Sequence, residues 1–284
     1  MRIRDYIRSM TKGLLILLFT LPSFCFAQDS LKCDSVFKVI YKKWDEVQNM
    51  SYHSYKKERK LGEYEEAEFD FVVQRNPYKV AGVMTEKRHR LLFDPSQNEN
   101  QALYISYGFP YTNLWLDIHG KIFRGLNHYT ISNAGCEFIF GIIQNEYKRM
   151  PEKFRCTHIT TNNRKEVEIY AETNDFTFTE YEAKQGENVL SIANKFKAMA
   201  YLILEKNQGM IDDYEEDCGG KTLLIPSHYG SSVKLVVDAE HGMPTLIEVS
   251  DEHGLIQRYR YTNYEFNKDL PSEYFTEDFL DSLD

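Results

Sequence analysis

The pattern of apolar and polar residues changes its period along the chain. Between residues 34 and 49, apolar residues recur every three or four positions, which predicts an amphipathic helix. The stripe that this helix has to bury consists of Phe37, Ile40, Tyr41, Trp44 and Val47. In the segment 68–74 the period becomes two, with Phe69, Phe71 and Val73 on one face and polar residues on the other. Such alternation is typical of an antiparallel strand with one buried face.

Short alternating segments fill most of the remaining chain. Further strands are predicted at residues 78–84, 89–93, 102–107, 114–119, 155–160, 166–172 and 176–183. A second amphipathic helix is predicted to begin near Asn133 and to end at Pro151. Three more strands near the C-terminus are joined by turns rich in Gly, Asp and Pro, and their alternation is carried by Val233, Leu235, Val237, Thr245, Ile247, Val249, Gln257, Tyr259 and Tyr261. The pattern predicts an α+β protein in which two helices cover one face of an antiparallel sheet.

One segment departs from this alternation. After a strand at 180–183, two helical stretches are predicted at 189–196 and 199–206, followed by a loop and a strand at 220–226. This order, strand, helix, helix and strand within about fifty residues, predicts a compact βααβ unit inserted into the sheet domain. We call residues 180–229 the module. Residues 28–179 and 230–284 then form the sheet domain.

The module carries an ordered set of residues with a family pattern: Gly186, Ile192, Ala193, Phe196, Ile203, Leu204, Asn207, Gly220, Leu223, Ile225 and Pro226. In these positions it resembles the LysM family, whose members bind glycans that contain N-acetylglucosamine, such as peptidoglycan. The resemblance implies a glycan-binding site at Gly186, Glu187, Asn188, Val189, Asn207, Gln208 and Ile211. Glu187 and Asn188 replace the family's Asp and Thr, and the loop 209–219 is longer and acidic. A module that has kept the fold and lost the glycan is therefore the alternative.

The sheet domain carries weaker motifs at 76–80, at 126–131 and from 234 to 279. In these it resembles the DUF1571 family of exported Bacteroidetes proteins, which are related in shape to the lipoprotein carriers of the periplasm. The resemblance implies a curved, half-barrel antiparallel sheet around an apolar cavity that helices plug. The expected lining residues are Phe69, Phe71, Leu114, Leu116, Ile118, Leu235, Val237 and Tyr259, and the alternative for each is ordinary sheet core. For His128 we expect a structural hydrogen bond to a loop carbonyl.

The first residues predict export. Basic residues at positions 2, 4, 8 and 12 precede a short apolar segment at 13–19, and the small Ala27 stands just before Gln28. This arrangement is typical of a signal peptide that is cleaved after residue 27 and directs the chain to the periplasm. Acylation of Cys25, as in a lipoprotein, is the alternative, and the bulky Phe24 before it argues against this.

Charge and cysteine content narrow the function further. Residues 1–27 hold four basic residues and one acidic residue, so the mature chain has 30 Lys and Arg against 42 Asp and Glu, a net charge of −12. A chain this acidic is expected to repel nucleic acid. An oxidising periplasm permits disulfides among Cys33, Cys136, Cys156 and Cys218, and the sequence leaves their pairing open. Cys136 is expected to be a small buried residue.

The sequence lacks the common catalytic and metal-binding motifs. It has no Gly-x-Ser-x-Gly elbow, no His-Glu-x-x-His motif and no paired cysteines at zinc spacing, so we expect neither an enzyme nor a metal or other cofactor. The leading hypothesis is a periplasmic binding or scaffolding protein whose module contacts peptidoglycan. The alternative is a periplasmic carrier that holds the acyl chain of a lipid or lipoprotein. An apolar cavity in the sheet domain would distinguish the second from the first.

Overall fold

The computed structural model describes residues 30–108 and 112–283, so the expected signal peptide and Cys25 lie outside the described residues. Twelve strands form one antiparallel sheet in the order β1-β8-β9-β12-β13-β14-β2-β3-β4-β5-β6-β7. Their bounds are β1 Ser30–Leu31, β2 Asn49–Lys60, β3 Glu63–Gln74, β4 Lys79–Met84, β5 Arg90–Phe93, β6 Gln101–Ile105, β7 Asn113–Asp117, β8 Phe154–Thr161, β9 Arg164–Glu172, β12 Ser232–Asp238, β13 Pro244–Asp251 and β14 Gly254–Phe266. Segments far apart in sequence meet at its centre, because β14 pairs with β2.

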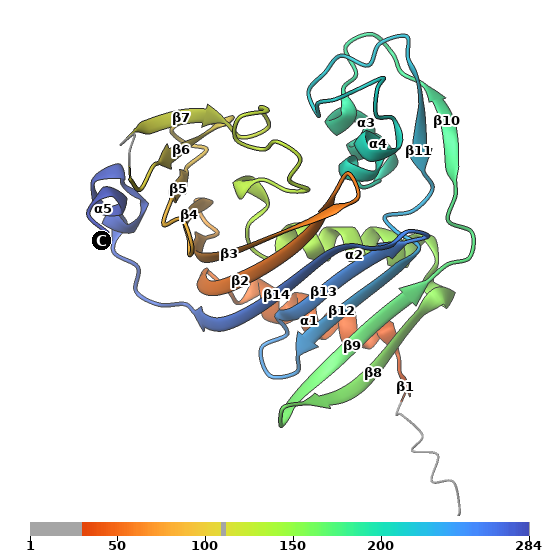
Figure 1. The fold of residues 1–284 in the computed structure, drawn as a ribbon. Helices are drawn as coiled ribbons and strands as arrows, with labels where there is room; N and C mark the ends of the chain where they lie inside the picture. The colour runs from red at the N-terminus through yellow and green to blue at the C-terminus, as the bar shows by residue number, and fades with distance from the viewer. Residues whose placement is uncertain (1–29, 109–111, 284) are drawn as a thin grey trace, which may run out of the picture.

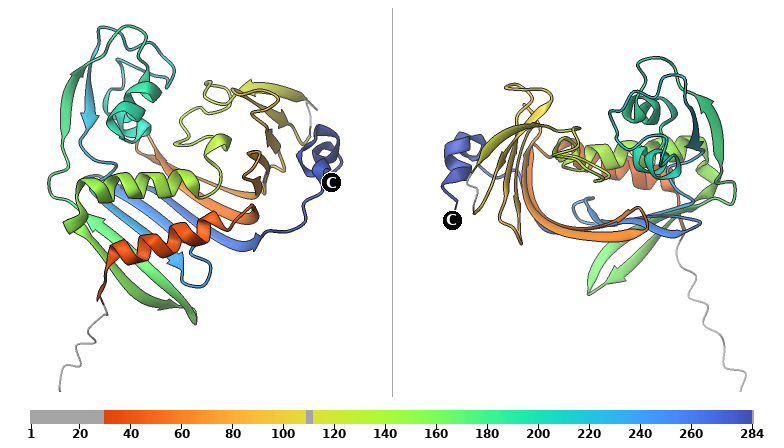
Figure 2. Two further views of the ribbon diagram at one scale, coloured as in Figure 1. Left: turned by 180° about the vertical axis from the view of Figure 1, so that it is seen from behind. Right: turned by 45° about the horizontal axis from the view of Figure 1, so that its top comes forward.

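The sheet is curved and open (Figure 1). The strands β4 to β7 turn upward from the plane of β8, β9 and β12 to β14, so that the sheet has a concave face (Figure 2). The protein is therefore an α+β protein with an unclosed antiparallel sheet, which confirms the predicted fold class. Among the described residues, no helix has both the length and the apolar character needed to cross a membrane.

Two helices, α1 (Cys33–Asp45) and α2 (Glu137–Arg149), lie side by side across the concave face (Figure 2). Short 3₁₀ turns flank α2 at Ile131–Asn133 and Pro151–Lys153. The predicted stripe is buried except for Tyr41, which is partly buried, and its Trp44 ring lies 5.9 Å from the ring of Phe140 in α2. The two helices thus form a common layer over the main core.

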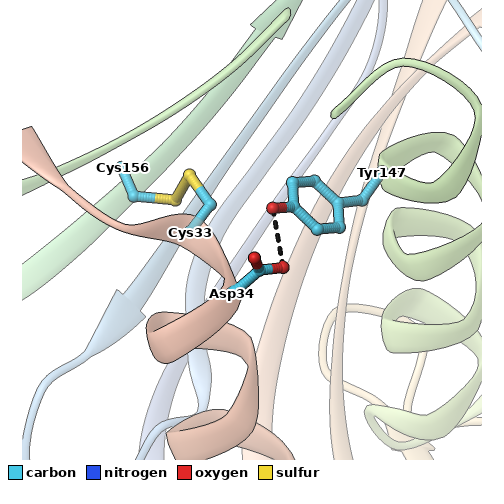
Figure 3. The surroundings of a disulfide bond; sticks show 4 residues. All are labelled: Cys33, Asp34, Tyr147 and Cys156. Atoms are coloured by element: carbon cyan, nitrogen blue, oxygen red, sulfur yellow. Dashed lines mark hydrogen bonds between the residues drawn. A yellow bond between two sulfur atoms is a disulfide. The ribbon is translucent and has the colours of Figure 1, made fainter. Parts of the chain in front are cut away.

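A disulfide bond joins this helical layer to the sheet. Cys33, at the start of α1, is bonded to Cys156 in β8, across a sequence separation of 123 (Figure 3). Beside it, the Tyr147 hydroxyl donates a 2.8 Å hydrogen bond to Asp34. Within the described chain, Cys136 and Cys218 are buried free thiols, which confirms the expectation for Cys136.

The module has the predicted order of elements. It consists of β10 (Phe178–Glu182), which begins two residues before the predicted start of the module, α3 (Val189–Phe196), α4 (Ala200–Lys206) and β11 (Thr222–Pro226). Strands β10 and β11 pair in a separate antiparallel sheet. It has its own core, whose largest contributors are Val189, Ile192, Ile203, Leu204, Ile211, Tyr214 and Leu223. Opposite the module, the C-terminal 3₁₀ turn Ser272–Phe275 and helix α5 (Glu277–Asp281) pack on β4 to β6.

Two predictions about secondary structure were wrong. The first helix ends at Asp45 and not at 49, and residues 49–60 form the long strand β2, which we did not predict. Its alternation is visible only at Met50 and Tyr52, because the residues that follow them on the same face are Ser54 and then charged residues. The second helix begins at Glu137, four residues later than expected, because a 3₁₀ turn occupies the predicted start.

Candidate functional site

A cavity of about 440 Å³ lies between the concave face of the sheet, helix α2 and the segment 122–135. Its volume is within the range of small-molecule sites, about 300–1,000 Å³. Strands β2 to β7 contribute Tyr52, Phe69, Phe71, Met84, Leu91, Tyr104, Leu114 and Leu116 to its wall. Helix α2 contributes Phe138, Ile139, Ile142 and Ile143, and β12 to β14 contribute Val233, Ile247, Val249, Tyr259 and Tyr261. Most of the wall is therefore apolar or aromatic.

A glycine determines where one aromatic ring of the wall lies. Phe71 in β3 is directly opposite Gly82 in β4. A Cβ atom added at Gly82 would lie only 2.7 Å from the Phe71 ring. Any larger residue at position 82 would therefore displace this ring from its place on the wall.

Large apolar side chains are exposed where the cavity opens. Leu114 is 46% exposed, Ile122 is 85% exposed and Phe138 is 37% exposed, and all three line the cavity. Single exposed apolar residues are common, but a group of them around one opening is typical of a binding surface.

The other wall of the cavity is polar, because β2 and β14 place charged and hydroxyl groups there. Glu58 is buried, and each of its carboxylate oxygens has a partner. One lies 3.2 Å from the Lys56 ammonium, and the other accepts a hydrogen bond from the Tyr259 hydroxyl. The Lys56 ammonium also donates a 2.7 Å hydrogen bond to Asn127. Burial opposes the ionisation of Glu58, but the nearby His128, Lys56 and the Tyr259 hydroxyl outweigh it and hold the pKa of Glu58 at about 2.

A buried hydrogen-bond chain extends this polar wall. The two ring nitrogens of His128 lie 2.9 Å from the Arg59 carbonyl and 2.9 Å from the Gln257 side-chain oxygen. Gln257 in turn donates to the Tyr129 hydroxyl at 2.7 Å, which lies 2.6 Å from the Tyr229 hydroxyl. His128 thus contacts a backbone carbonyl, as predicted, but this carbonyl belongs to strand β2 and not to a loop. Burial lowers the pKa of His128.

The structure brings together five of the eight residues that we predicted to line a cavity: Phe69, Phe71, Leu114, Leu116 and Tyr259. Ile118, Leu235 and Val237 do not line it, and these predictions were wrong. Leu235 and Val237 share a face with Val233, but they lie further along β12, in the core that contains α1. Ile118 follows the end of β7 and is buried in the same core.

Several residues of the candidate site were missed. The charged pair Lys56 and Glu58 belongs to the unpredicted strand β2, and the buried Arg124 lies in a segment between elements. The alternation of charged residues at positions 56, 58 and 60 was the available signal. It indicates a strand with a polar face, which apolar periodicity alone does not detect.

In the module, several predicted glycan-binding side chains point inward. Val189 and Ile211 are fully buried, and so is Asn207. The Asn207 side chain is used twice on β11, where it accepts from the Leu224 amide at 2.8 Å and donates to the Leu224 carbonyl at 2.9 Å. These three side chains therefore belong to the core of the module, and glycan contact through the backbone at these positions stays a prediction.

The other predicted positions lie in the first loop or on the surface. The Asn188 side chain caps α3 by accepting from the Ser191 amide at 2.9 Å, as its position before the helix predicted. Glu187 forms an ion pair with Lys195 at 3.0 Å. Gly186 has a positive φ of 80°, and Gln208 is exposed. Glycan binding by this loop stays a prediction.

No protein-family model and no curated protein matches the chain. Among solved structures, it is similar to an uncharacterized conserved protein of Thermus thermophilus, at 6% identity and a TM-score of 0.41, over 86% of this chain and 93% of that one. It is also similar to the Mycobacterium tuberculosis lipoprotein LppX, at 9% identity and a TM-score of 0.37, over 84% and 97% of the chains. A LolA superfamily protein of Nitrosomonas europaea matches at 8% identity and a TM-score of 0.30, over 85% and 98%. We base the function on the cavity of this chain alone.

Proposed function

We propose that this protein is an exported carrier that holds the acyl chain of a lipid or lipoprotein in the cavity of its sheet domain. The observation that carries the proposal is the apolar wall of a 440 Å³ cavity that opens between exposed apolar side chains. Each methylene group that moves from water into such a site contributes about 0.8 kcal/mol. An acyl chain can therefore bind there without specific hydrogen bonds along its length. Carriage of a lipid makes and breaks no bond, so the proposal assigns no catalytic residue.

The disulfide supports the proposed location. Disulfide bonds persist in oxidising compartments such as the periplasm and are rare in the cytosol. The Cys33–Cys156 bond therefore agrees with export by the signal peptide that we expect at residues 1–27. Both observations favour a periplasmic carrier.

We prefer this role to a peptidoglycan tether because the two candidate sites differ in which side chains are free to contact a ligand. The side chains of Asn188 and Asn207, which the glycan hypothesis needs, already make hydrogen bonds within the module. The side chains of the cavity wall, such as Leu114 and Phe138, remain partly exposed.

Two neighbouring residues of β7 provide a matched test. Leu116 lines the cavity, whereas Trp115 points to the opposite face of the strand. We would titrate the apolar fluorescent dye N-phenyl-1-naphthylamine into the wild-type protein, Leu116→Glu and Trp115→Glu. We expect saturable binding to the wild type, at least about tenfold weaker binding to Leu116→Glu, and unchanged binding to Trp115→Glu, because only the first variant places a charge in the apolar wall.

Circular dichroism would establish that both variants are folded. Absence of saturable dye binding by the wild-type protein would refute the carrier role. Equal weakening by the two substitutions would show that the dye binds elsewhere on β7, and the cavity would lose its assigned role.

A further inference from the structure

The cavity wall contains a buried cation that contacts no anion. Arg124 lies between β7 and the 3₁₀ turn at Ile131–Asn133, lines the cavity and is only 5% exposed. Its guanidinium donates to the carbonyl of Asn127 at 3.2 Å and to that of His128 at 2.7 Å. It also lies 3.4 Å from the His119 ring nitrogen. All three partners are uncharged acceptors when His119 is neutral. They satisfy N–H donors of Arg124 but do not compensate its positive charge.

The aromatic neighbour of Arg124 does not compensate this charge either. The Tyr214 ring of the module lies 3.9 Å from the guanidinium carbon, in a cation–π contact. Such a contact stabilises a cation by about 0.5–2 kcal/mol, which is less than a buried carboxylate would provide. In the part of the chain that the structure describes, no carboxylate lies within 4 Å of Arg124. Glu58 and Glu215 act on it only through space.

The other charges of the wall cancel one another. Among the described residues, the charged side chains that line the cavity are Lys56, Glu58 and Arg124. Lys56 and Glu58 form a pair at 3.2 Å, and the second oxygen of Glu58 is bonded to Tyr259. Lys60, behind them, is paired with Glu65 at 2.7 Å. Arg124 therefore leaves the wall with one positive charge in excess.

A buried and unpaired guanidinium is costly, because arginine remains protonated at all physiological pH values. Burial lowers the pKa of Arg124, as this cost requires, without making it neutral. Arginine has more N–H donors than the three contacts use, and its fork-shaped geometry suits carboxylate and phosphate oxygens. An anionic group in the cavity would therefore supply the charge that the protein itself does not.

Building on the proposed acyl-chain function, we infer that the ligand is an anionic amphiphile, with its chain against the apolar wall and its acidic headgroup on Arg124. The chemistry that Arg124 recognises is shared by fatty carboxylates and by lipid phosphates. A neutral acylated ligand would fill the same cavity but would leave the cation unpaired.

The test compares three ligands that share one chain: palmitic acid, hexadecyl phosphate and hexadecanol. Each would compete with N-phenyl-1-naphthylamine for the wild-type protein at about pH 8, where both acids are ionised. We expect the two anionic ligands to compete at least about tenfold better than the alcohol. Whichever of palmitic acid and hexadecyl phosphate competes better would identify the preferred headgroup as a carboxylate or a phosphate.

Variants assign this preference to one side chain. Arg124→Met should bring palmitic acid and hexadecyl phosphate down to the affinity of hexadecanol, which itself should change little. Lys57→Met is the matched control, because Lys57 directly follows Lys56 in the chain and pairs with Glu66 on the other face of β2. Arg124→Lys keeps the positive charge and should keep most of the preference for the two acids over hexadecanol. If Arg124→Met does not fold, this variant tests whether the preference depends on the charge at position 124.

The possible failures are distinguishable. If hexadecanol binds the wild type as tightly as palmitic acid, the headgroup inference is overturned and the carrier role stands. If Arg124→Met retains the preference for acids, the inference is likewise overturned. If none of the three ligands displaces the dye, the proposed carrier function itself fails.

Discussion

The sheet domain and the module bury their apolar side chains in different ways. In the module, Val189, Ile192 and Ile203 are fully buried, and the polar side chain of Asn207 is bonded to β11. In the sheet domain, the apolar side chains of β3, β7 and α2 surround an open space. Close packing stabilises a fold, whereas an unfilled apolar wall gains free energy only when something fills it. The difference agrees with a structural role for the core of the module and with the proposed binding role of the cavity.

Polar groups differ between the two regions in the same way. The module uses Asn188 and Asn207 to satisfy its own backbone, whereas the cavity wall leaves the charge of Arg124 uncompensated. A buried ion cluster joins the regions: Arg59 of β2 pairs with Glu205 of α4 at 2.7 Å and with Asp251 of β13 at 2.5 Å.

Breaking this cluster should have the largest effect on stability. Arg59→Met leaves Asp251 buried without a cation and should lower the free energy of unfolding by about 3–5 kcal/mol. Urea unfolding measures this effect. Lys57→Met, which removes a surface ion pair two residues earlier, should hardly shift the urea midpoint. Similar midpoints for the two variants would mean that the buried cluster stabilises the protein no more than the surface pair does.

Matched isoleucine substitutions test the contrast between a closed core and an open wall. Ile192→Ala, in the module, should cost about 2–5 kcal/mol, because it removes close contacts and leaves a new void. Ile142→Ala, on the cavity wall, only enlarges an existing space and should cost about 1 kcal/mol. Urea unfolding of both variants, without ligand, gives the two values. Equal costs would show that the wall is packed as tightly as the module.

Acid unfolding compares two carboxylates with lowered pKa values. The pKa of the buried Glu58 is about 2 when folded and near 4.5 when unfolded, so its contribution to stability is present above about pH 4.5 and is lost as the pH falls toward 2. Glu58→Gln should remove about 2 kcal/mol of this pH dependence.

Glu187 of the module provides the contrast, because its side chain is 18% exposed whereas that of Glu58 is 1% exposed. Its pKa is also lowered, by the Tyr181 hydroxyl, the Lys184 amide and Lys195, but its carboxylate lies at the partly exposed surface of the module. Glu187→Gln should therefore change the pH dependence less, and the change should disappear at high salt. Urea unfolding between about pH 2.5 and 5, at low and high salt, measures both variants. A Glu58→Gln curve parallel to that of the wild type would contradict the burial of an ionised Glu58.

The smallest expected effects separate fold from glycan binding in the module. Asn207→Ala should destabilise the protein by about 1–2 kcal/mol, because it leaves the Leu224 backbone groups without partners. Gln208→Ala, at the exposed neighbouring position, should leave stability unchanged. Retention on purified peptidoglycan provides the second measurement. If Gln208→Ala reduces retention without loss of stability, the module binds glycan in addition to its structural role.

Much of this contrast could be predicted from the sequence, because many of the elements involved have one uniformly apolar face. Alternation placed Phe69, Phe71, Leu114 and Leu116 on the wall, and helical periodicity gave α3 its observed bounds. It could not separate Leu235 from Val233, because both share a face and only the position of the helices decides which of them borders the cavity.

Strand β2 and Arg124 were missed for a different reason. The face of β2 that borders the cavity carries Lys56 and Glu58, so the apolar alternation stops at the site itself. The partners of these residues come from distant segments, since Glu58 bonds to Tyr259 and Lys56 to Asn127. Functional sites often break the local pattern in this way, and their long-range contacts cannot be deduced from one sequence.

Native mass spectrometry of the protein, gently purified from the cell envelope, tests the central claim most directly. The account predicts a second population, heavier by the mass of one acyl-bearing anion, that disappears after extraction with organic solvent and is absent from Leu116→Glu. A single population with the mass of the chain alone, from protein that also fails to bind palmitic acid when it is added, would contradict it.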